Sequence, residues 1–299
     1  MKEALAIVNP AAGGGTCGKE AQGALDSLRK GDMALKVVET TGPGDATALA
    51  KEAFANGTRH FIAVGGDGTS CEIVNGFMGP SRDTGETCTL GFLPFGTGNS
   101  YLRDFTQHGT GAALNALKEG RSRPSDVNAL HHDGGIFYSL NILSMGFTAR
   151  VGATTNQRFK SFGELGYILG VVTTLAGLES DPFAMTVDGI EEEEKALTFL
   201  SLNNSQYTGG KMRMAPGAST EDGLCEMIEV GKMGRVRLLQ LFPRIFKGTH
   251  VQAPEVNTRR AKEIVFRGAG PMDVMADGEV IRVVPRKVEV IPQAFRVNI

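Results

Sequence analysis

The sequence predicts two domains of different class, an α/β domain with a parallel sheet followed by a β-rich antiparallel, sandwich-like domain. Strand and helix patterns alternate up to about residue 123, which is typical of a parallel sheet with covering helices. From residue 124 onward, short apolar runs separated by turn residues follow one another, which indicates antiparallel strands. The 299 residues suffice for two domains. We therefore expect domains at 1–123 and 124–299, and the last residues could return to the first domain.

The elements of the first domain follow from the spacing of apolar residues. Each apolar run of about five residues predicts a buried strand, and each longer amphipathic segment between two runs predicts a helix. Asp45 is expected to cap the N-terminus of the second helix. Strands are expected at 4–8, 34–39, 60–64 and 89–93, and helices at 19–30, 45–56, 71–78 and 110–119.

The second half contains mostly short strand patterns, with two helical segments inserted at 163–178 and 234–247. Pro243 interrupts the second of these segments. The sequence His131-His132-Asp133-Gly134-Gly135 predicts a hairpin turn rather than a metal site. Strands are expected at Val127–Leu130, Ile136–Ile142, Phe183–Val187, Leu197–Leu202, Leu224–Val230, Glu263–Phe266, Val274–Val284 and Lys287–Ile291.

The composition is that of an ordinary globular protein, with 41% hydrophobic and 21% charged residues. A net charge of -2 gives no basic field for a nucleic acid, so no such partner is expected. No apolar stretch is long enough to span a membrane, and the start of the chain does not have a signal-peptide pattern. The four cysteines have no metal-binding spacing and are expected to be free thiols in a cytoplasmic protein.

The sequence Gly65-Gly66-Asp67-Gly68-Thr69 directly follows the apolar run 61–64. Glycine has no Cβ, so a backbone N–H can approach an anion closely at such a loop. A carboxylate beside a phosphate requires a divalent cation to offset the repulsion. The loop therefore predicts a nucleotide phosphate site with Mg²⁺; the alternative is a tight turn that happens to contain an aspartate.

Two similar loops follow other strands, at Pro94–Asn99 and at Asn9–Gly15. The carboxyl ends of parallel strands share one edge of a sheet, where ligands bind in open α/β folds. We therefore expect the three loops to converge on one ligand.

The N-terminal loop also matches two other patterns. Gly13-x-Gly15-x-x-Gly18 fits a dinucleotide fingerprint with Glu39 as the ribose-binding acid, but four residues separate the strand from the first glycine. Gly13-x-x-x-x-Gly18-Lys19 resembles a P-loop, except that Glu20 replaces the hydroxyl residue. A dinucleotide-dependent oxidoreductase is therefore kept as an alternative.

Several short motifs occur in an order and spacing that together are highly specific. With these motifs the chain resembles, almost end to end, the diacylglycerol kinase catalytic-domain superfamily, in particular the soluble bacterial lipid kinases related to sphingosine kinases. The resemblance implies a first domain of the NAD-kinase/phosphofructokinase-like kind. The motifs are Asn9-Pro10-x-x-Gly13, Gly44-Asp45-Ala46, Gly65-Gly66-Asp67-Gly68-Thr69, Pro94-x-Gly96-Thr97-x-Asn99, Gly209-Gly210-Lys211-Met212-x-x-Ala215-Pro216, Asp222-Gly223-Leu224 and Asp277-Gly278-Glu279.

The resemblance also implies roles for individual residues. Asp67 would help to hold the catalytic Mg²⁺, and Glu279 would be the general base, with Asp277 and Asp126 in the supporting carboxylate network. A second, structural Mg²⁺ would bind Asp222 and the carbonyls of Ser219 and Leu224. ATP would contact Asn9, Pro10, Ala11, Ala12, Gly13, Thr40, Gly65, Gly66, Asp67, Gly68, Thr69, Ser70, Cys71 and Thr97.

One position departs from many relatives, which have an aspartate directly after the asparagine of the Gly-Thr-x-Asn loop. Here Ser100 follows Asn99, and Asp104 comes four residues later. The departure bears on the acceptor and on the details of the network rather than on kinase activity. Asp277-Gly278 is also expected to form a hairpin turn that can project Glu279 into a cleft.

The function implied is an ATP- and Mg²⁺-dependent lipid kinase of phospholipid biosynthesis, with diacylglycerol as the leading acceptor and phosphatidic acid as its product. Phosphatidylglycerol, a sphingoid base or ceramide are alternative acceptors. A kinase of NAD or of sugar phosphates shares the Gly-Gly-Asp-Gly loop, and a non-catalytic nucleotide or lipid sensor is a further alternative. The sequence does not identify the acceptor.

A membrane lipid as substrate implies peripheral contact with the inner face of the membrane, and the chain could also form a homodimer. Segment 163–178 could line a groove for an acyl chain, and segment 234–247, with Arg235, Arg237 and Arg244, could lie on anionic headgroups. The alternative for both segments is that they only cover the core of the second domain.

Overall fold

The computed structural model describes residues 3–31, 33–105, 109–158 and 163–299. The chain divides into two compact units. The first contains the residues up to Ser125 together with 293–299, and the second contains Asp126–Pro292. The chain passes from the first unit to the second within β5 (Ser122–His132) and returns within β19 (Pro285–Asn298).

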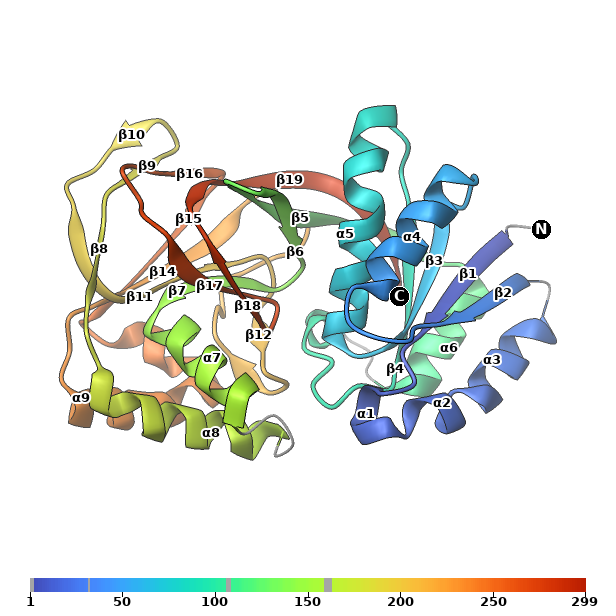
Figure 1. Ribbon diagram of the computed structural model, residues 1–299, viewed down its shortest axis with the longest axis horizontal. Helices are drawn as coiled ribbons and strands as arrows, with labels where there is room; N and C mark the ends of the chain where they lie inside the picture. Colours follow the sequence, from blue (N-terminus) through green and yellow to red (C-terminus); the bar gives the residue numbers. More distant parts are fainter. Residues whose placement is uncertain (1–2, 32, 106–108, 159–162) are drawn as a thin grey trace. The chain divides into compact units, whose positions relative to one another are not determined.

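The first unit is built on a parallel sheet in the order β2-β1-β3-β4, extended at β4 by the last residues of β19 (Figure 1). Arg296 and Val297 pair in parallel with Thr89 and Leu90 of β4, so the end of the chain becomes a strand of this sheet. The four sequential strands are β1 (Glu3–Val8), β2 (Ala34–Glu39), β3 (His60–Gly65) and β4 (Thr89–Pro94).

Helices cover both faces of this sheet. On one face, Leu25 and Leu28 of α3 (Gln22–Arg29) and Leu117 of α6 (Thr110–Glu119) share a core cluster with alternate residues of β1 and β3. On the other face, α4 (Asp45–Ala55) packs on α5 (Asp67–Thr84), and the ring of Phe77 stacks on that of Phe61 with centroids 5.3 Å apart. Two short helices, α1 (Ala12–Gly15) and α2 (Cys17–Glu20), precede α3.

The predicted strands of this unit agree with the structure to within one residue at each end. The predicted helix at 19–30 is divided between α2 and α3, and the helix at 71–78 is the middle of the longer α5, which begins within the Gly-Gly-Asp-Gly-Thr sequence. The prediction that Asp45 caps α4 is wrong. Gly44 occupies the cap position, and the Asp45 carboxylate accepts the N–H groups of Thr41 (2.8 Å) and Gly42 (3.1 Å), thereby closing the preceding loop.

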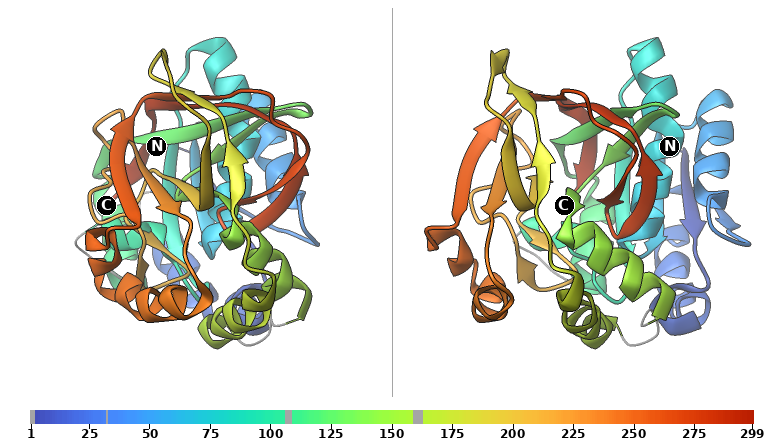
Figure 2. Two further views of the ribbon diagram at one scale, coloured as in Figure 1. Left: turned by 90° about the vertical axis from the view of Figure 1, so that its left-hand side faces the viewer. Right: turned by 60° about the vertical axis from the view of Figure 1, so that its left-hand side comes forward.

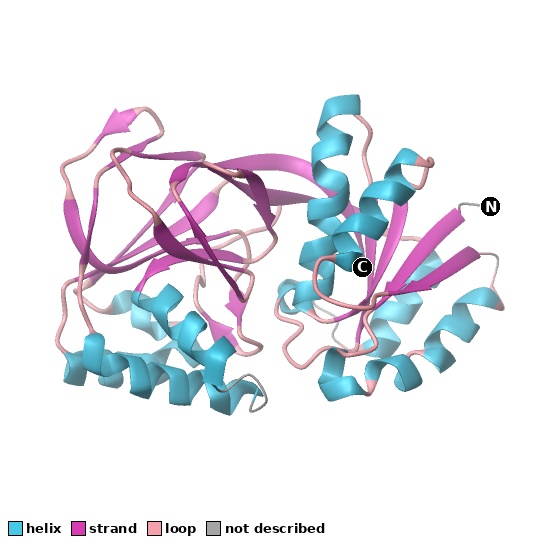
Figure 3. Cartoon of the chain, viewed as in Figure 1, coloured by secondary structure: helices cyan, strands magenta, loops and turns pink. Residues whose placement is uncertain are grey.

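The second unit is an antiparallel sandwich (Figures 2 and 3). One sheet runs in the order β15-β14-β11-β7-β17-β18, with β8 also pairing with β11, and the other contains β10, β9, β16, β19, β5 and β6. Leu200 and Met227 of the first sheet share one core cluster with Ile264 and Val288 of the second. The strands are β6 (Gly135–Ser139), β7 (Ile142–Gly146), β8 (Asp181–Phe183), β9 (Met185–Val187), β10 (Ile190–Glu191), β11 (Lys195–Asn203), β14 (Cys225–Gly231), β15 (Val256–Ala261), β16 (Glu263–Phe266), β17 (Met272–Ala276) and β18 (Glu279–Val283); β12 (Tyr207–Thr208) and β13 (Met212–Arg213) form a separate ribbon.

Helical segments pack at one end of this sandwich. The predicted segment 163–178 contains α8 (Gly163–Thr174) and the 3₁₀ turn η3 (Leu175–Gly177). The predicted segment 234–247 is α9 (Arg235–Leu241), which continues as the 3₁₀ helix η4 (Phe242–Lys247) at Pro243, and η5 (Thr249–Gln252) follows it. Helix α7 (Phe147–Arg158) was not predicted from the sequence.

Three predicted strands of the second unit are each two strands in the structure. Ile136–Ile142 contains parts of β6 and β7, Phe183–Val187 contains β8 and β9, and Val274–Val284 is the β17–β18 hairpin. Strand β15 was not predicted because its sequence Val-Asn-Thr-Arg-Arg-Ala is mostly polar, although it pairs with β14 over six residues. The predicted turn at 131–135 does join β5 to β6.

A cluster of charged side chains ties the edge of the first sheet of the sandwich together. Glu229 of β14 is almost completely buried and accepts from Lys195 of β11 (3.0 Å) and Arg259 of β15 (2.9 Å). Glu192, just before β11, binds the same two cations, with 2.9 Å to Lys195 and 2.8 Å to Arg259. The two carboxylates and two cations therefore neutralise one another across three strands.

The cluster predicts a dependence of stability on pH. The hydrogen bond from Arg259 lowers the pKa of Glu192 from its ordinary 4.5 to about 2. A carboxyl whose pKa is lower in the folded state stabilises the fold above its unfolded pKa and loses that contribution as pH falls through the folded value. We expect the free energy of unfolding to fall between pH 4.5 and about 2, in part through Glu192. Urea denaturation at several pH values measures it.

Glu192→Gln should remove part of this dependence, whereas Glu193→Gln, at the exposed neighbouring position, should leave it as in the wild type. An unchanged pH dependence in Glu192→Gln would show that the cluster does not stabilise the second unit through Glu192.

Candidate active site

The three glycine-rich loops of the first unit lie together at the carboxyl ends of their strands. The Asn9 N–H donates to the Val64 carbonyl (2.9 Å), which joins the loop after β1 to the end of β3. The N–H groups of Phe95 and Gly96 both donate to the Gly65 carbonyl (2.9 and 2.8 Å), which joins the loops after β3 and β4. The loops are thus fixed to one another by backbone hydrogen bonds.

Two of these glycines are required by contact between backbones. A Cβ on Gly96 would lie 2.2 Å from the Cα of Gly66, and a Cβ on Gly13, whose φ is +61°, would lie 2.5 Å from the Phe95 carbonyl oxygen. No atom lies within 4 Å of a Cβ built on Gly68, so packing does not explain the glycine there. Gly68 is in the first turn of α5, where unpaired backbone N–H groups and the helix dipole favour an anion.

The Asp67 carboxylate connects the loop after β3 with the loop after β4. Its two oxygens accept the N–H groups of Ser100 (2.8 Å) and Tyr101 (3.2 Å) at the start of the 3₁₀ helix η1 (Tyr101–Asp104). Ser100, where the sequence departs from many relatives, thus contributes its backbone N–H. A carboxylate has about four lone-pair sites, and its oxygen donors are those that Mg²⁺ prefers, so Asp67 has the chemistry of a Mg²⁺ ligand.

The other residues predicted to contact ATP differ in their exposure. Ala11 and Thr97 are exposed, and the Asn9 side chain donates to the Thr69 hydroxyl (3.3 Å) and accepts the Ala11 N–H (3.1 Å). Thr40, Thr69, Ser70 and Cys71 are buried, while Pro10, Ala12, Gly13 and Gly66 are half-buried. A ligand at these loops would therefore meet mainly backbone and the Asn9 and Thr97 side chains.

In the second unit, Glu279 is the first residue of β18, directly after the β17–β18 turn. Asp277 (φ +49°) and Gly278 (φ +95°) are both left-handed, as a type I′ turn requires, so the predicted hairpin is present. The Glu279 side chain is on the exposed part of the hairpin.

The Asp277 carboxylate is buried and accepts four hydrogen bonds from one segment. The donors are the Ser139 hydroxyl (2.8 Å) and the N–H groups of Leu140 (2.7 Å), Asn141 (2.9 Å) and Ile142 (2.9 Å). Burial raises the pKa of this carboxyl, and each of the four hydrogen bonds acts in the opposite direction. Asp277 therefore fixes the hairpin that carries Glu279 to the loop between β6 and β7.

Asp126 holds a second turn. Its buried carboxylate accepts the Gly223 N–H (2.7 Å), and its own N–H donates to the Thr220 carbonyl (2.7 Å). The Asn204 amide donates to the carbonyls of both Asp126 (3.0 Å) and Leu140 (2.9 Å), so it links this turn to the segment bound by Asp277. Asn204 was not among the predicted site residues; its only signal was the polar sequence Asn203-Asn204-Ser205 after an apolar strand.

The turn 219–224 contains the predicted second metal site. Asp222 Oδ1 accepts the Leu224 N–H (3.1 Å), and the Ser219 hydroxyl accepts the Glu221 N–H (3.3 Å). The Arg260 guanidinium lies 3.5 Å from Asp222 Oδ2 and already supplies a positive charge. The described residues include no group of three or more His, Cys, Asp or Glu side chains suited to a metal. A metal here would therefore depend on backbone carbonyls together with Asp222.

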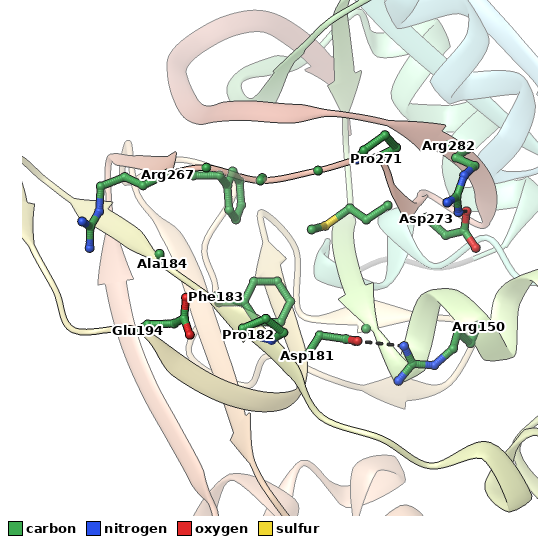
Figure 4. Close-up of a pocket in the computed structure, with 16 residues that line it drawn as sticks. Arg150, Asp181, Pro182, Phe183, Ala184, Glu194, Arg267, Pro271, Asp273 and Arg282 are labelled. Carbon is green, nitrogen blue, oxygen red and sulfur yellow. Dashed lines mark hydrogen bonds and ion pairs between the residues drawn. The ribbon is translucent and has the colours of Figure 1, made fainter.

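The second unit also has a cavity of about 480 Å³, formed by residues other than those predicted for the active site (Figure 4). Four of its charged side chains pair with one another, Arg150 with Asp181 (2.9 Å) and Arg282 with Asp273 (3.0 Å). None of the residues predicted for the active site lines it.

Two family models match the chain, the diacylglycerol kinase catalytic domain over residues 3–130 and the YegS C-terminal NAD kinase beta sandwich-like domain over residues 141–299. A diacylglycerol kinase of Mycobacterium tuberculosis is 31% identical over 297 residues, covering 98% of this chain and 93% of the relative. A diacylglycerol kinase of Staphylococcus aureus is 29% identical over 282 residues, covering 93% and 86%.

Solved structures show the same fold. A diacylglycerol kinase from Bacillus anthracis matches with a TM-score of 0.71 at 23% identity, covering 99% of this chain and 96% of that one. An NAD kinase from Archaeoglobus fulgidus in complex with ATP matches with a TM-score of 0.50 at 14% identity, covering 98% and 92%.

The fold and both family matches define a two-domain kinase. The chain belongs to the diacylglycerol kinase family. The predicted resemblance, the fold class and the assignment to the lipid kinases of this family are therefore confirmed, and the oxidoreductase and P-loop interpretations are wrong. Membership of a kinase family implies ATP as the phosphoryl donor. No helix in the described part of the chain is long and apolar enough to cross a membrane.

The contact between the loops after β3 and β4 predicts the effect of a single methyl group. Gly96→Ala places a Cβ against the Gly66 backbone, so the loops must move apart. We expect a loss of roughly 1–3 kcal/mol in unfolding free energy, together with weaker binding of ATP. Denaturant unfolding and titration with a fluorescent ATP analogue measure the two effects.

Gly79→Ala in α5 is the matched control, because no atom lies within 4 Å of its Cβ. Alanine is favoured over glycine within a helix by roughly 0.5–1 kcal/mol, so this variant should be no less stable than the wild type. Equal behaviour of the two variants would mean that the loop contact has no part in stability or in nucleotide binding.

Proposed function

We propose that this protein transfers the γ-phosphoryl group of ATP, with Mg²⁺, to the free hydroxyl of diacylglycerol and forms phosphatidic acid. The observation that carries the proposal is the convergence of three glycine-rich loops at the start of α5, with the Asp67 carboxylate fixed between two of them, in a chain of this kinase family. The names of the relatives from Mycobacterium tuberculosis and Staphylococcus aureus favour diacylglycerol as the acceptor.

The first unit would hold the donor. The backbone N–H groups at the start of α5 and at the loops around Gly66 and Gly96 bind phosphate oxygens, and the exposed Thr97 lies on the same loops. Asp67, together with the ATP phosphates, would hold Mg²⁺, which would neutralise charge on the transferring group. The protein's own contribution at this stage is to position the phosphates, since the loops are fixed to one another before the ligand arrives.

The second unit would supply the base. As the acceptor oxygen bonds to the γ-phosphorus and the bond to the ADP oxygen breaks, Glu279 takes the proton of the hydroxyl. Asp277 acts as a positioning residue, since it fixes the hairpin that carries Glu279 and its own oxygens are occupied by donors of the segment 139–142.

An apolar cavity in the second unit favours a lipid acceptor. It is lined by α7, α9, η4 and neighbouring segments. Three methionines, Met212, Met214 and Met233, are among the lining residues. The Phe147 and Thr148 side chains of α7 line the cavity, and one turn later Gly152 packs against Val280, next to Glu279. The cavity has about 40 Å³ of space, so an acyl chain would enter only as the flexible methionine side chains move.

A histidine, His250, also lines this apolar cavity. His250 is 3% exposed, and neither ring nitrogen has a hydrogen-bond partner in the described part of the chain; the backbone of Met214, although close, makes no hydrogen bond of normal geometry. Burial lowers the pKa of His250 to about 4, so the ring is neutral at neutral pH. A neutral imidazole can hydrogen-bond an ester group of a bound lipid, which is a further reason to expect a diacylglycerol.

The reaction is tested by ADP release with Mg-ATP over a panel of acceptors, with Glu279→Gln in parallel. We expect turnover with diacylglycerol and a decrease in kcat of about 10²- to 10⁴-fold in the variant, because the amide cannot take the proton. The panel also contains phosphatidylglycerol, sphingosine, ceramide, NAD and fructose 6-phosphate.

Glu193 is an exposed glutamate outside the proposed site. The control variant Glu193→Gln should therefore retain the wild-type kcat. If another lipid is the only one phosphorylated, that lipid is the acceptor instead of diacylglycerol. Phosphorylation of NAD or of the sugar phosphate would overturn the assignment to a lipid kinase. ATP binding without turnover of any acceptor would favour the non-catalytic sensor.

The cavity predicts a change in acyl-chain preference. Leu241 of α9 is buried and lines the cavity, so Leu241→Ala should enlarge it. We expect kcat/KM for a long-chain diacylglycerol to rise relative to that for a short-chain one, with a loss of roughly 2–5 kcal/mol in stability. The neighbouring Gln240 is exposed, and Gln240→Ala should change neither quantity. An unchanged ratio in a folded Leu241→Ala variant would remove the cavity from the proposal.

A further inference from the structure

The segment formed by α9 and η4 has apolar side chains on two opposite sides. Leu238, Leu241 and Ile245 face inward and are buried. Val236 is 71% exposed, and Leu239 and Phe246 are also exposed large apolar residues. A surface helix of a globular protein normally has polar residues on its outer side, so an outward apolar row indicates a further contact.

Helix α8 continues this apolar surface. Val172 is 57% exposed, and residues 165–178 contain no charged residue. The Arg235 guanidinium of α9 donates to the Ala176 carbonyl just after α8 (2.6 Å), so the two segments are joined directly. Figures 1 and 2 both show α8 and α9 at the same end of the second unit. We call this surface the end face; its apolar residues are Ile168, Leu169, Val172, Val236, Leu239 and Phe246.

The charge along the part of the end face formed by α9 and η4 has one sign. Residues 231–254 contain five lysines and arginines and no acidic residue, in a chain whose net charge is -2. Arg237 pairs with Glu255 (2.8 Å), and the half-buried Arg244 donates to the Thr249 carbonyl (2.7 Å), whereas Arg235 remains exposed while it donates to Ala176. The cations available to an outside partner therefore differ in part from the three arginines considered in the sequence analysis. Lys232, Arg235 and Lys247 are exposed and have no acidic partner among the residues that the structure describes.

We propose that the end face docks on the surface of an anionic lipid bilayer. Val236, Leu239 and Phe246 enter the boundary between headgroups and acyl chains, and Lys232, Arg235 and Lys247 bind the anionic headgroups. An exposed apolar row bordered by cations is the pattern of an interfacial segment. A second copy of the chain fits the same face poorly, because a symmetric contact would bring the two cationic borders together.

The test is co-sedimentation of the whole protein with vesicles, without ATP or diacylglycerol. The wild type should bind vesicles of phosphatidylcholine with phosphatidylglycerol, and bind less to phosphatidylcholine alone. Val236→Ser combined with Leu239→Ser should weaken binding by about tenfold or more, because two apolar side chains no longer leave water. Both positions are exposed, so the thermal midpoint should stay near that of the wild type.

Two matched controls separate the end face from general effects. Ile190→Ser, at an equally exposed residue of β10, should bind vesicles as the wild type does. Lys232→Gln and Lys247→Gln should each weaken binding to the anionic vesicles by about fivefold, whereas Lys51→Gln, at an exposed lysine of α4, should not.

Equal binding by the wild type and the Val236→Ser, Leu239→Ser variant, or an equal loss in Ile190→Ser, would overturn the proposal. Loss of binding in the variant with full turnover of a water-soluble short-chain diacylglycerol would support it. Vesicle binding does not depend on turnover. A protein that binds vesicles but phosphorylates no lipid would support docking by the end face and overturn the proposed function. A protein that phosphorylates diacylglycerol but does not bind vesicles would overturn docking and support the proposed function.

Discussion

The positions of the acidic residues of the second unit depend on the hydrogen bonds that the buried carboxylate of Asp277 accepts. Four donors from one short segment, Ser139 to Ile142, converge on it, three of them backbone N–H groups. Because a buried carboxylate without donors is very costly, the hairpin and the segment have to be formed together. Asn204 extends the connection to Asp126 and so to the turn at 219–224. The position of Glu279 is therefore set by residues far away in the sequence.

In the first unit, an aspartate carboxylate likewise holds backbone segments together, here at the glycine-rich loops. Asp67 accepts two backbone N–H groups from the loop after β4, and a close contact between two glycines holds the loops together. Asp67 and Asp277, two aspartates of the sequence motifs, thus both organise backbone. A carboxylate fixed in this way loses little conformational freedom when a cation or a nucleotide arrives, which is the physical basis of preorganisation.

The sequence predicted the first unit well because each element carries a strong local signal: an apolar run ends in glycines, and a helix follows. The second unit was less predictable. Strand β15 is polar, and α7 has no strong signal at either end. The Asp277-Gly278 turn could be predicted from two residues, but its four donors lie 135 to 138 positions away, and no local pattern identifies them. Asn204 was missed for the same reason, since its two acceptors lie 78 and 64 positions away in the sequence.

The return of the chain to the first unit has a consequence for biosynthesis. Phe295 is completely buried and packs against Phe77, and Arg296 and Val297 form the strand beside β4. During synthesis the α/β unit therefore emerges with the edge of β4 unpaired, and that edge is closed only after the whole second unit has been synthesised. Until then, the N–H and C=O groups of β4 are open to pairing with other nascent chains. Completion of the first sheet thus requires that the second unit has already been synthesised.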